Sequence, residues 1–138
     1  MIRLPSILLP MLMLAAVPAF AQSVGDCGEW TSARNLPEPW QDSTATYADG
    51  HVRIAVLDTL EPAAAAVHLL IISPPLNELG ERQCKTVSFS GAPDAEGWPS
   101  GFMAIDFARR QADYNPQSGL QITLPVQVFN PDTAPKML

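Results

Sequence analysis

The residues of this chain with the greatest capacity for chemistry are its two histidines, His51 and His68. An imidazole can bind a transition metal or transfer a proton near neutral pH. If the strands that carry them pair, the two rings could approach one another, and Asp49 or Asp58 could add a carboxylate ligand for zinc or copper. No spacing supports such a site, because strand register alone would decide it. The ordinary outcome is a solvated His51 and a neutral, hydrogen-bonded His68 in the core, so we predict no metal and no cofactor.

Other catalytic patterns are missing from the sequence. The Gly-x-Ser-x-Gly motif does not occur, and Asp94 and Glu96 lack the further oxygen ligands of a calcium loop. We therefore predict a protein that is not an enzyme and serves for binding or as an accessory of a cell-envelope assembly. One alternative is a small secreted hydrolase whose site assembles only in three dimensions. It would be favoured by a Ser or Asp within hydrogen-bond reach of a histidine. Another alternative is a structural subunit that exchanges strands.

One loop is a candidate for contact with a partner. The segment Gly91 to Gly101 is long, flanked by glycines and carries Trp98. An exposed aromatic side chain on a loop can anchor a protein or small ligand. Trp98 could equally fold back and cover the core, so its partner-binding role is a hypothesis.

The first residues resemble an export signal. A single basic residue, Arg3, precedes an apolar run, and Ala19-Phe20-Ala21 has the small-large-small pattern that a signal peptidase cuts. The run is too short for the roughly 20 residues of a spanning helix, and prolines interrupt it. We predict a signal peptide over 1–21, a mature chain that begins at Gln22, no membrane span after cleavage, and a periplasmic or extracellular location.

The two cysteines of the chain, Cys27 and Cys84, fit this location. In an oxidising compartment the economical prediction is one disulfide between them. They are too far apart in sequence for a redox pair, and too few other ligands exist for a zinc site. Closing a loop of this length would stabilise the fold by roughly 4 kcal/mol in the chain-entropy model.

Charge and length limit the partners and the number of domains. The net charge is −6, and cleavage would remove one basic residue and no acidic one, which leaves −7. A net negative surface disfavours nucleic acid as a partner. We expect an extended N-terminal arm (22–43), whose Trp30 and Trp40 cover an open end of the core, one β-domain (44–130) and a flexible tail (131–138).

Alternation of apolar and polar residues predicts short strands. Asp49-Gly50 is typical of a hairpin turn, between strands at 43–48 and 51–58. The apolar run 63–73, bracketed by prolines, is typical of a central strand buried on both faces, although its alanines favour a helix. Further strands are expected at 84–90, 102–108 and 120–129.

Two of these later strands carry specific expectations. In 102–108, Met103 shares a face with Ile105 and Phe107, which places Met103 in the core pattern. In 120–129, Pro125 cannot donate a hydrogen bond, so this strand should be bulged or lie at an edge. Six or seven short strands predict an antiparallel β-sandwich, immunoglobulin-like in general architecture, and a small β-barrel is the alternative.

Overall fold

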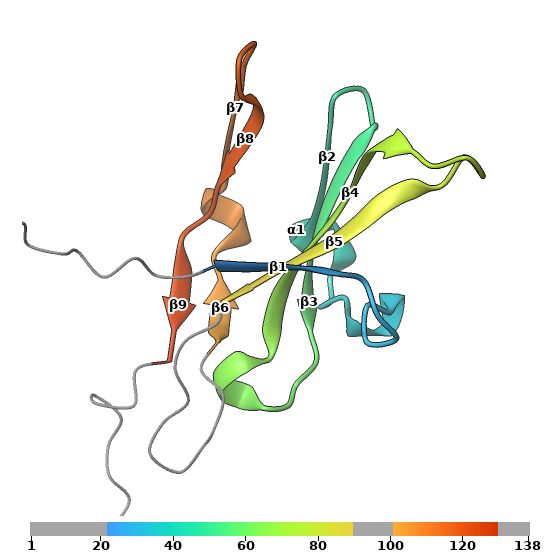
Figure 1. Cartoon of the computed structure of the whole chain (residues 1–138). Helices are drawn as coiled ribbons and strands as arrows, with labels where there is room; N and C mark the ends of the chain where they lie inside the picture. The colour runs from blue at the N-terminus through green and yellow to red at the C-terminus, as the bar shows by residue number, and fades with distance from the viewer. Residues whose placement is uncertain (1–21, 90–100, 130–138) are drawn as a thin grey trace, which may run out of the picture.

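The computed structural model describes residues 22–89 and 101–129, whose arrangement is shown in Figure 1. The expected signal peptide, the part of the loop that carries Trp98, and the expected tail lie outside the described residues. The hypotheses for those segments therefore stay predictions.

The described residues form nine strands, and every strand pair is antiparallel. The main sheet has the order β1-β5-β4-β3-β2, and β6 joins it at the start of β4 and pairs in turn with β9. A separate hairpin is formed by β7 and β8. The strand bounds are β1 (Gln22–Asp26), β2 (Thr44–Tyr47), β3 (Val52–Asp58), β4 (Val67–Leu76), β5 (Arg82–Phe89), β6 (Phe102–Ile105), β7 (Gln111–Asn115), β8 (Gly119–Thr123) and β9 (Val126–Val128).

The predicted all-β, antiparallel, sandwich-like fold is confirmed, with the Cys27–Cys84 disulfide in place. The predicted strand number is too low. The strand β1 lies in the arm, where the sequence shows no alternation, and the single strand expected at 120–129 is broken into β8 and β9 at Pro125. Over the described residues both sheets are open, so the alternative of a closed barrel is wrong.

The segment 27–43 crosses one face of the main sheet. The disulfide fastens its start to Cys84 of β5, and Trp30 packs on His68 of β4 with ring centroids 4.5 Å apart. The short helices η1 (Ala33–Asn35) and α1 (Trp40–Ser43) then lead to β2 at the other edge. Neither tryptophan covers an open end of the core as predicted: Trp30 packs on this face of the sheet at 37% exposure, and Trp40 is 57% exposed.

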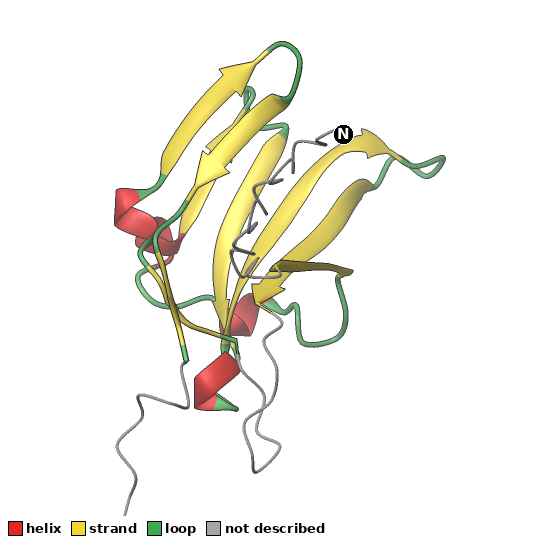
Figure 2. Ribbon diagram, turned by 60° about the vertical axis from the view of Figure 1, so that its left-hand side comes forward, coloured by secondary structure: helices red, strands yellow, loops and turns green. Residues whose placement is uncertain are grey.

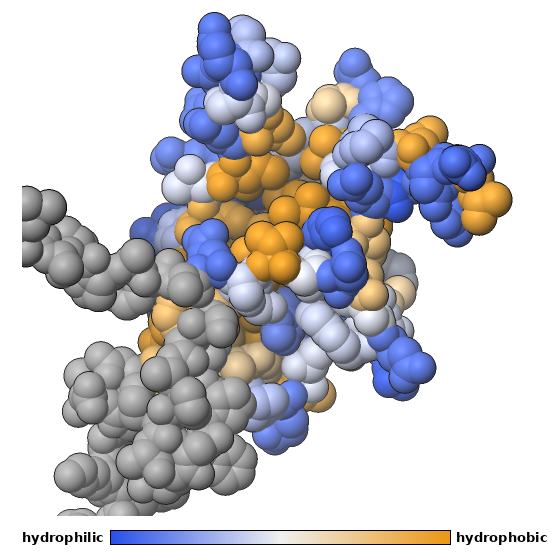
Figure 3. Space-filling model, viewed as in Figure 1, coloured by the Kyte–Doolittle hydropathy of each residue, from blue (hydrophilic) through white to orange (hydrophobic). Residues whose placement is uncertain are grey.

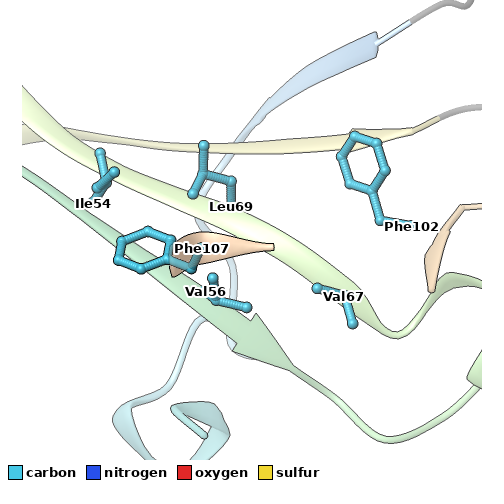
Figure 4. Packing of buried hydrophobic residues seen from close by; sticks show 6 residues of the cluster. All are labelled: Ile54, Val56, Val67, Leu69, Phe102 and Phe107. Atoms are coloured by element: carbon cyan, nitrogen blue, oxygen red, sulfur yellow. The ribbon is translucent and has the colours of Figure 1, made fainter. Parts of the chain in front are cut away.

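The opposite face of the sheet carries the hydrophobic core, and β6 to β9 form the layer beside it (Figure 2). The buried cluster, drawn in Figure 4, joins side chains of β3 and β4 to Phe102 of β6 and Phe107 of the short helix η3 (Phe107–Arg109). Ile54 of β3 is fully buried. Burial of each large apolar side chain contributes about 1.5–3 kcal/mol, so this cluster is the main source of stability.

The prediction that Met103 belongs to the core is wrong. Phe102 is buried, and Met103 is 45% exposed. The β6–β9 pairing shifts register between Phe102 and Ala104, and such a bulge interrupts the alternation of side chains. Phe102 and Ile105 consequently line the same space, although their positions differ by an odd number and regular alternation would place them on opposite faces.

The central strand is confirmed in place, but its bounds differ and it is not buried on both faces, since its buried residues Val67 and Leu69 share one face. Ala63–Ala65 form the 3-10 helix η2, and β4 begins at Val67 and continues through Pro74 and Pro75 to Leu76. The turn is held by the Gly101 N–H, which donates to the Ala64 carbonyl at 3.0 Å. β4 lies between β3 and β5, so the interpretation as a middle strand was correct.

The β2–β3 hairpin is confirmed where Asp49-Gly50 predicts it. Tyr47 pairs with Val52, and Ala48, Asp49 and Gly50 all have positive φ. The loop is therefore four residues long rather than two, since Ala48 adopts the left-handed conformation as well.

Candidate functional site

The two histidines lie far apart in the structure. His51 is exposed in the β2–β3 turn. His68 pairs with Leu57 of β3, which lies six residues after His51 in the chain. At about 3.3 Å per residue, this separates the two positions by roughly 20 Å. Among the described residues, no group of three or more His, Cys, Asp or Glu side chains could hold a metal ion. The zinc or copper hypothesis built on these two rings has no geometric basis.

His68 has a polar partner that the sequence did not indicate. Its Nδ1 is hydrogen-bonded to Oγ of Ser88 on β5 at 2.7 Å, and the ring of Trp30 packs on it. The hydroxyl can donate to an unprotonated ring nitrogen or accept from a protonated one. Burial lowers the pKa of His68, and the nearby charge of Asp58 opposes this only partly. Burial therefore favours the neutral form of the His68 ring.

A serine beside a histidine is the arrangement that would favour a hydrolase, so its surroundings matter. Asp58 does not orient the ring of His68. It pairs with Val67, the residue before His68 on β4, and its carboxylate accepts a hydrogen bond from the Leu60 N–H at 2.8 Å. Ser88 lies within β5, which has β1 on one side and β4 on the other. The backbone N–H groups next to Ser88 donate hydrogen bonds to these adjacent strands and are not directed at an oxyanion. Among the described residues, His68 and Ser88 supply a base and a nucleophile, and no carboxylate is hydrogen-bonded to His68.

An apolar cleft lies on the other face of the main sheet. A cleft with a volume of about 370 Å³ separates β3, β4 and β5 from the layer of β6, β8 and β9. Figure 3 shows the corresponding apolar surface between the β7–β8 hairpin and the strands β2 to β5. The lining side chains are Gln22, Val52, Leu69, Ile71, Ser73, Val87, Phe102, Ile105, Leu120, Ile122, Leu124 and Val126.

The cleft exists because the second layer is only partly joined to the first. β8 pairs with β7 alone, so it presents apolar side chains to the main sheet without hydrogen bonds to it. At the base of this hairpin, Arg110 connects the layers: its Nε donates to the Tyr47 hydroxyl at 3.2 Å, and its guanidinium lies over the Phe107 ring. In the part of the chain that the structure describes, the two layers meet at this point and at β6, and a cleft remains between them.

The lining of the cleft defines what it could accommodate. Ten of its twelve residues are aliphatic or aromatic, none is ionisable in its side chain, and the two polar ones are Gln22 and Ser73. Taking a charged group into such a space without a partner is unfavourable, whereas an alkyl or aromatic group would gain by leaving water. The cleft therefore fits the apolar part of a ligand.

The sequence contained part of this site. The alternation of Leu120, Ile122 and Leu124 correctly marked one apolar face, and so did the run that contains Leu69 and Ile71. The sequence could not indicate that these apolar faces lie opposite one another with a cleft between them. The loop residue Trp98, the sequence-based candidate for partner binding, lies outside the described residues.

Comparison with known proteins gave no matching family model, no matching curated protein and no matching solved structure. Within the described part of the chain, no helix is long and apolar enough to span a membrane.

Proposed function

We propose that this is an exported, non-enzymatic binding protein that takes an apolar ligand into the cleft between its two layers. The observation that carries this proposal is the cleft itself. Its volume of about 370 Å³ lies in the range of roughly 300–1,000 Å³ that is usual for small-molecule sites. At roughly 30 Å³ for each group the size of a water molecule, it has room for about a dozen methylene-sized groups.

The proposed location outside the cytoplasm, periplasmic or extracellular, rests on two features. The leader pattern ends at Ala21, directly before β1, and the Cys27–Cys84 bridge is of the kind that persists in oxidising compartments. An apolar molecule is poorly soluble in water, so a protein that carries or senses it outside the cell must shield it. The cleft between the two layers would supply this shielding without additional elements.

The test measures binding of two neutral apolar probes, N-phenyl-1-naphthylamine by fluorescence and 1-decanol by calorimetry. The variant Ile122→Trp fills the cleft from β8, whose hydrogen bonds do not involve the main sheet. We expect it to reduce affinity at least tenfold, since the probe and the indole compete for one space. The matched control is Gln121→Trp, which adds the same side chain at an exposed position of the same strand.

The two variants separate the outcomes. Loss of binding in Ile122→Trp with retention in Gln121→Trp supports the cleft as the site. If the wild-type protein binds neither probe, or if both variants bind as it does, the cleft is an unfilled part of the core and the proposal is wrong.

The hydrogen bond of 2.7 Å between His68 and Ser88 favours one second candidate, a small hydrolase. Its test is turnover of an activated ester, p-nitrophenyl acetate, by the wild type and by Ser88→Ala. Ser23→Ala is the control, because Ser23 pairs with Ser88 across the β1–β5 ladder and its hydroxyl donates only to the Ser88 carbonyl. Turnover that disappears with Ser88 and survives the loss of Ser23 would support the hydrolase. A rate unaffected by either change would exclude it.

A further inference from the structure

Gln22 has three properties at once. It is the first residue of β1, it lines the cleft, and it is the residue at which the mature chain is expected to begin. Cleavage after Ala21 would convert its backbone N–H into an α-ammonium group, with an ordinary pKa of about 7.7–8.0. Signal removal would thus add one positive charge at the wall of an otherwise uncharged cleft.

The position of this group follows from strand pairing. Gln22 pairs with Phe89 at the end of β5, and the Phe89 ring lies 6.0 Å from the ring of Phe102, a buried residue that also lines the cleft. In Figure 1 the start of β1 lies beside β6, where the main sheet meets the second layer. The new terminus would therefore lie at one end of the cleft rather than in the middle of its apolar lining.

Within residues 22–89 and 101–129, few other charges face this end. On β1 and β5 the nearest are Asp26 and Lys85, bonded to each other at 2.5 Å and four strand positions away, which is roughly 13 Å. His68 of β4 lies on the opposite face of the sheet, bonded to Ser88. Beyond β6, Asp106 is paired with Arg109. Each of these groups already has a partner, so among the residues that the structure describes the ammonium group would be the free charge at this end.

We infer that the ligand is a monocarboxylate with an alkyl chain, such as a medium-chain fatty acid. Its carboxylate would pair with the Gln22 α-ammonium, and its chain would extend along Leu69 and Ile122. The inference rests on the proposed function and on cleavage after Ala21. The polarity of such a ligand matches that of the site. Its carboxylate would meet the single cation at the edge of the cleft, and its alkyl chain would occupy the apolar space of about 370 Å³ behind it. The net charge of the chain acts weakly on the bound head group, because separations beyond about 8 Å are screened at physiological salt.

The test uses the exported, processed protein, whose first residue is established by mass spectrometry. Decanoate and 1-decanol have the same chain and differ in the head group. We expect decanoate to bind about tenfold more tightly at about pH 6.5 than at about pH 9.5, where the amine is uncharged, and 1-decanol to bind equally at both.

A matched control removes the charge and leaves all side chains beyond position 22 in place. In an N-terminal glutamine, the α-amine nitrogen can attack the side-chain amide carbon. A lactam forms and the side-chain nitrogen leaves as ammonia. Glutaminyl cyclase is used to carry out this reaction, and mass spectrometry establishes that the product has formed. The cyclised form should bind decanoate about tenfold more weakly at pH 6.5 and 1-decanol as before.

The outcomes distinguish this inference from the proposed function. If neither decanoate nor 1-decanol binds, the proposed function fails. If both bind, and cyclisation and pH leave decanoate unaffected, the apolar site stands and the role of the ammonium group is wrong. A mature chain that begins at another residue, or that is already cyclised when isolated, also overturns the inference.

Discussion

Replacement of Gly101 by alanine tests how the second layer is attached to the first. A Cβ added at Gly101 would lie 2.5 Å from Cβ and 2.7 Å from Cα of Ala65 in η2. Neither atom can rotate away, because one belongs to the backbone and the other is bonded directly to it. Gly101 is further held by its N–H, which donates to the Ala64 carbonyl, and by its carbonyl, which accepts from the Phe129 N–H.

The expected effect is a loss of about 2–3 kcal/mol, the upper part of the range of about 1–3 kcal/mol for overpacking, because backbone must move. For a chain of this size the Tm should fall by roughly 10 °C. Thermal unfolding followed by circular dichroism, with urea unfolding at 25 °C, would measure both quantities.

Two further variants isolate the contact. Gly25→Ala is the control, since its added Cβ would lie 3.7 Å from the Thr86 hydroxyl, an ordinary contact, and it should change stability by less than about 1 kcal/mol. Ala65→Gly in the Gly101→Ala background removes one of the two close atoms and should recover part of the loss. A Gly101→Ala protein as stable as the wild type would show that η2 and β6 do not pack as described.

The remaining predictions concern the disulfide, the core and pH. Cys27→Ala combined with Cys84→Ala should lower stability by up to about 4 kcal/mol in urea unfolding, because it releases a loop with a sequence separation of 57; a loss below about 1 kcal/mol would contradict the entropic account. Ile54→Ala should cost about 2–5 kcal/mol, as the side chain is fully buried, whereas Val24→Ala, at 67% exposure, should change the unfolding free energy by less than about 0.5 kcal/mol. Burial lowers the pKa of His68, so the unfolded chain takes up the proton first, and stability should fall as pH drops below about 6.5. Unfolding measured from about pH 8 to about pH 5 should show a smaller decrease in His68→Gln, and identical curves would disprove this role.

Local sequence patterns determined the strands with strong signals. Asp49-Gly50 marks a hairpin because a turn there needs residues that tolerate positive φ, and this tolerance depends on residue type and not on the rest of the fold. Pro125 breaks the last strand because a proline has no N–H to donate. With two cysteines in the chain, one intramolecular bridge was the simplest pairing.

Elements with conflicting local signals were decided by contacts from elsewhere in the chain. Ala63–Ala65 could be helix or strand by propensity, and the packing of Gly101 against Ala65 places them in a 3-10 turn. Strand β1 has no alternation, and its pairing with β5 supplies the hydrogen bonds that make it a strand.

The candidate site could be recognised almost only from the tertiary structure. The sequence determined which faces of the strands are apolar, and hence that a layered β-protein would form. Whether Leu69 and Ile122 would touch or leave space between them depends on where β8 is anchored, and whether His68 would meet Ser88 depends on the β4–β5 register. Alternation repeats every two residues along one strand and carries no information about the distance between strands. That distance is set by the sum of long-range contacts, which only the folded chain brings together.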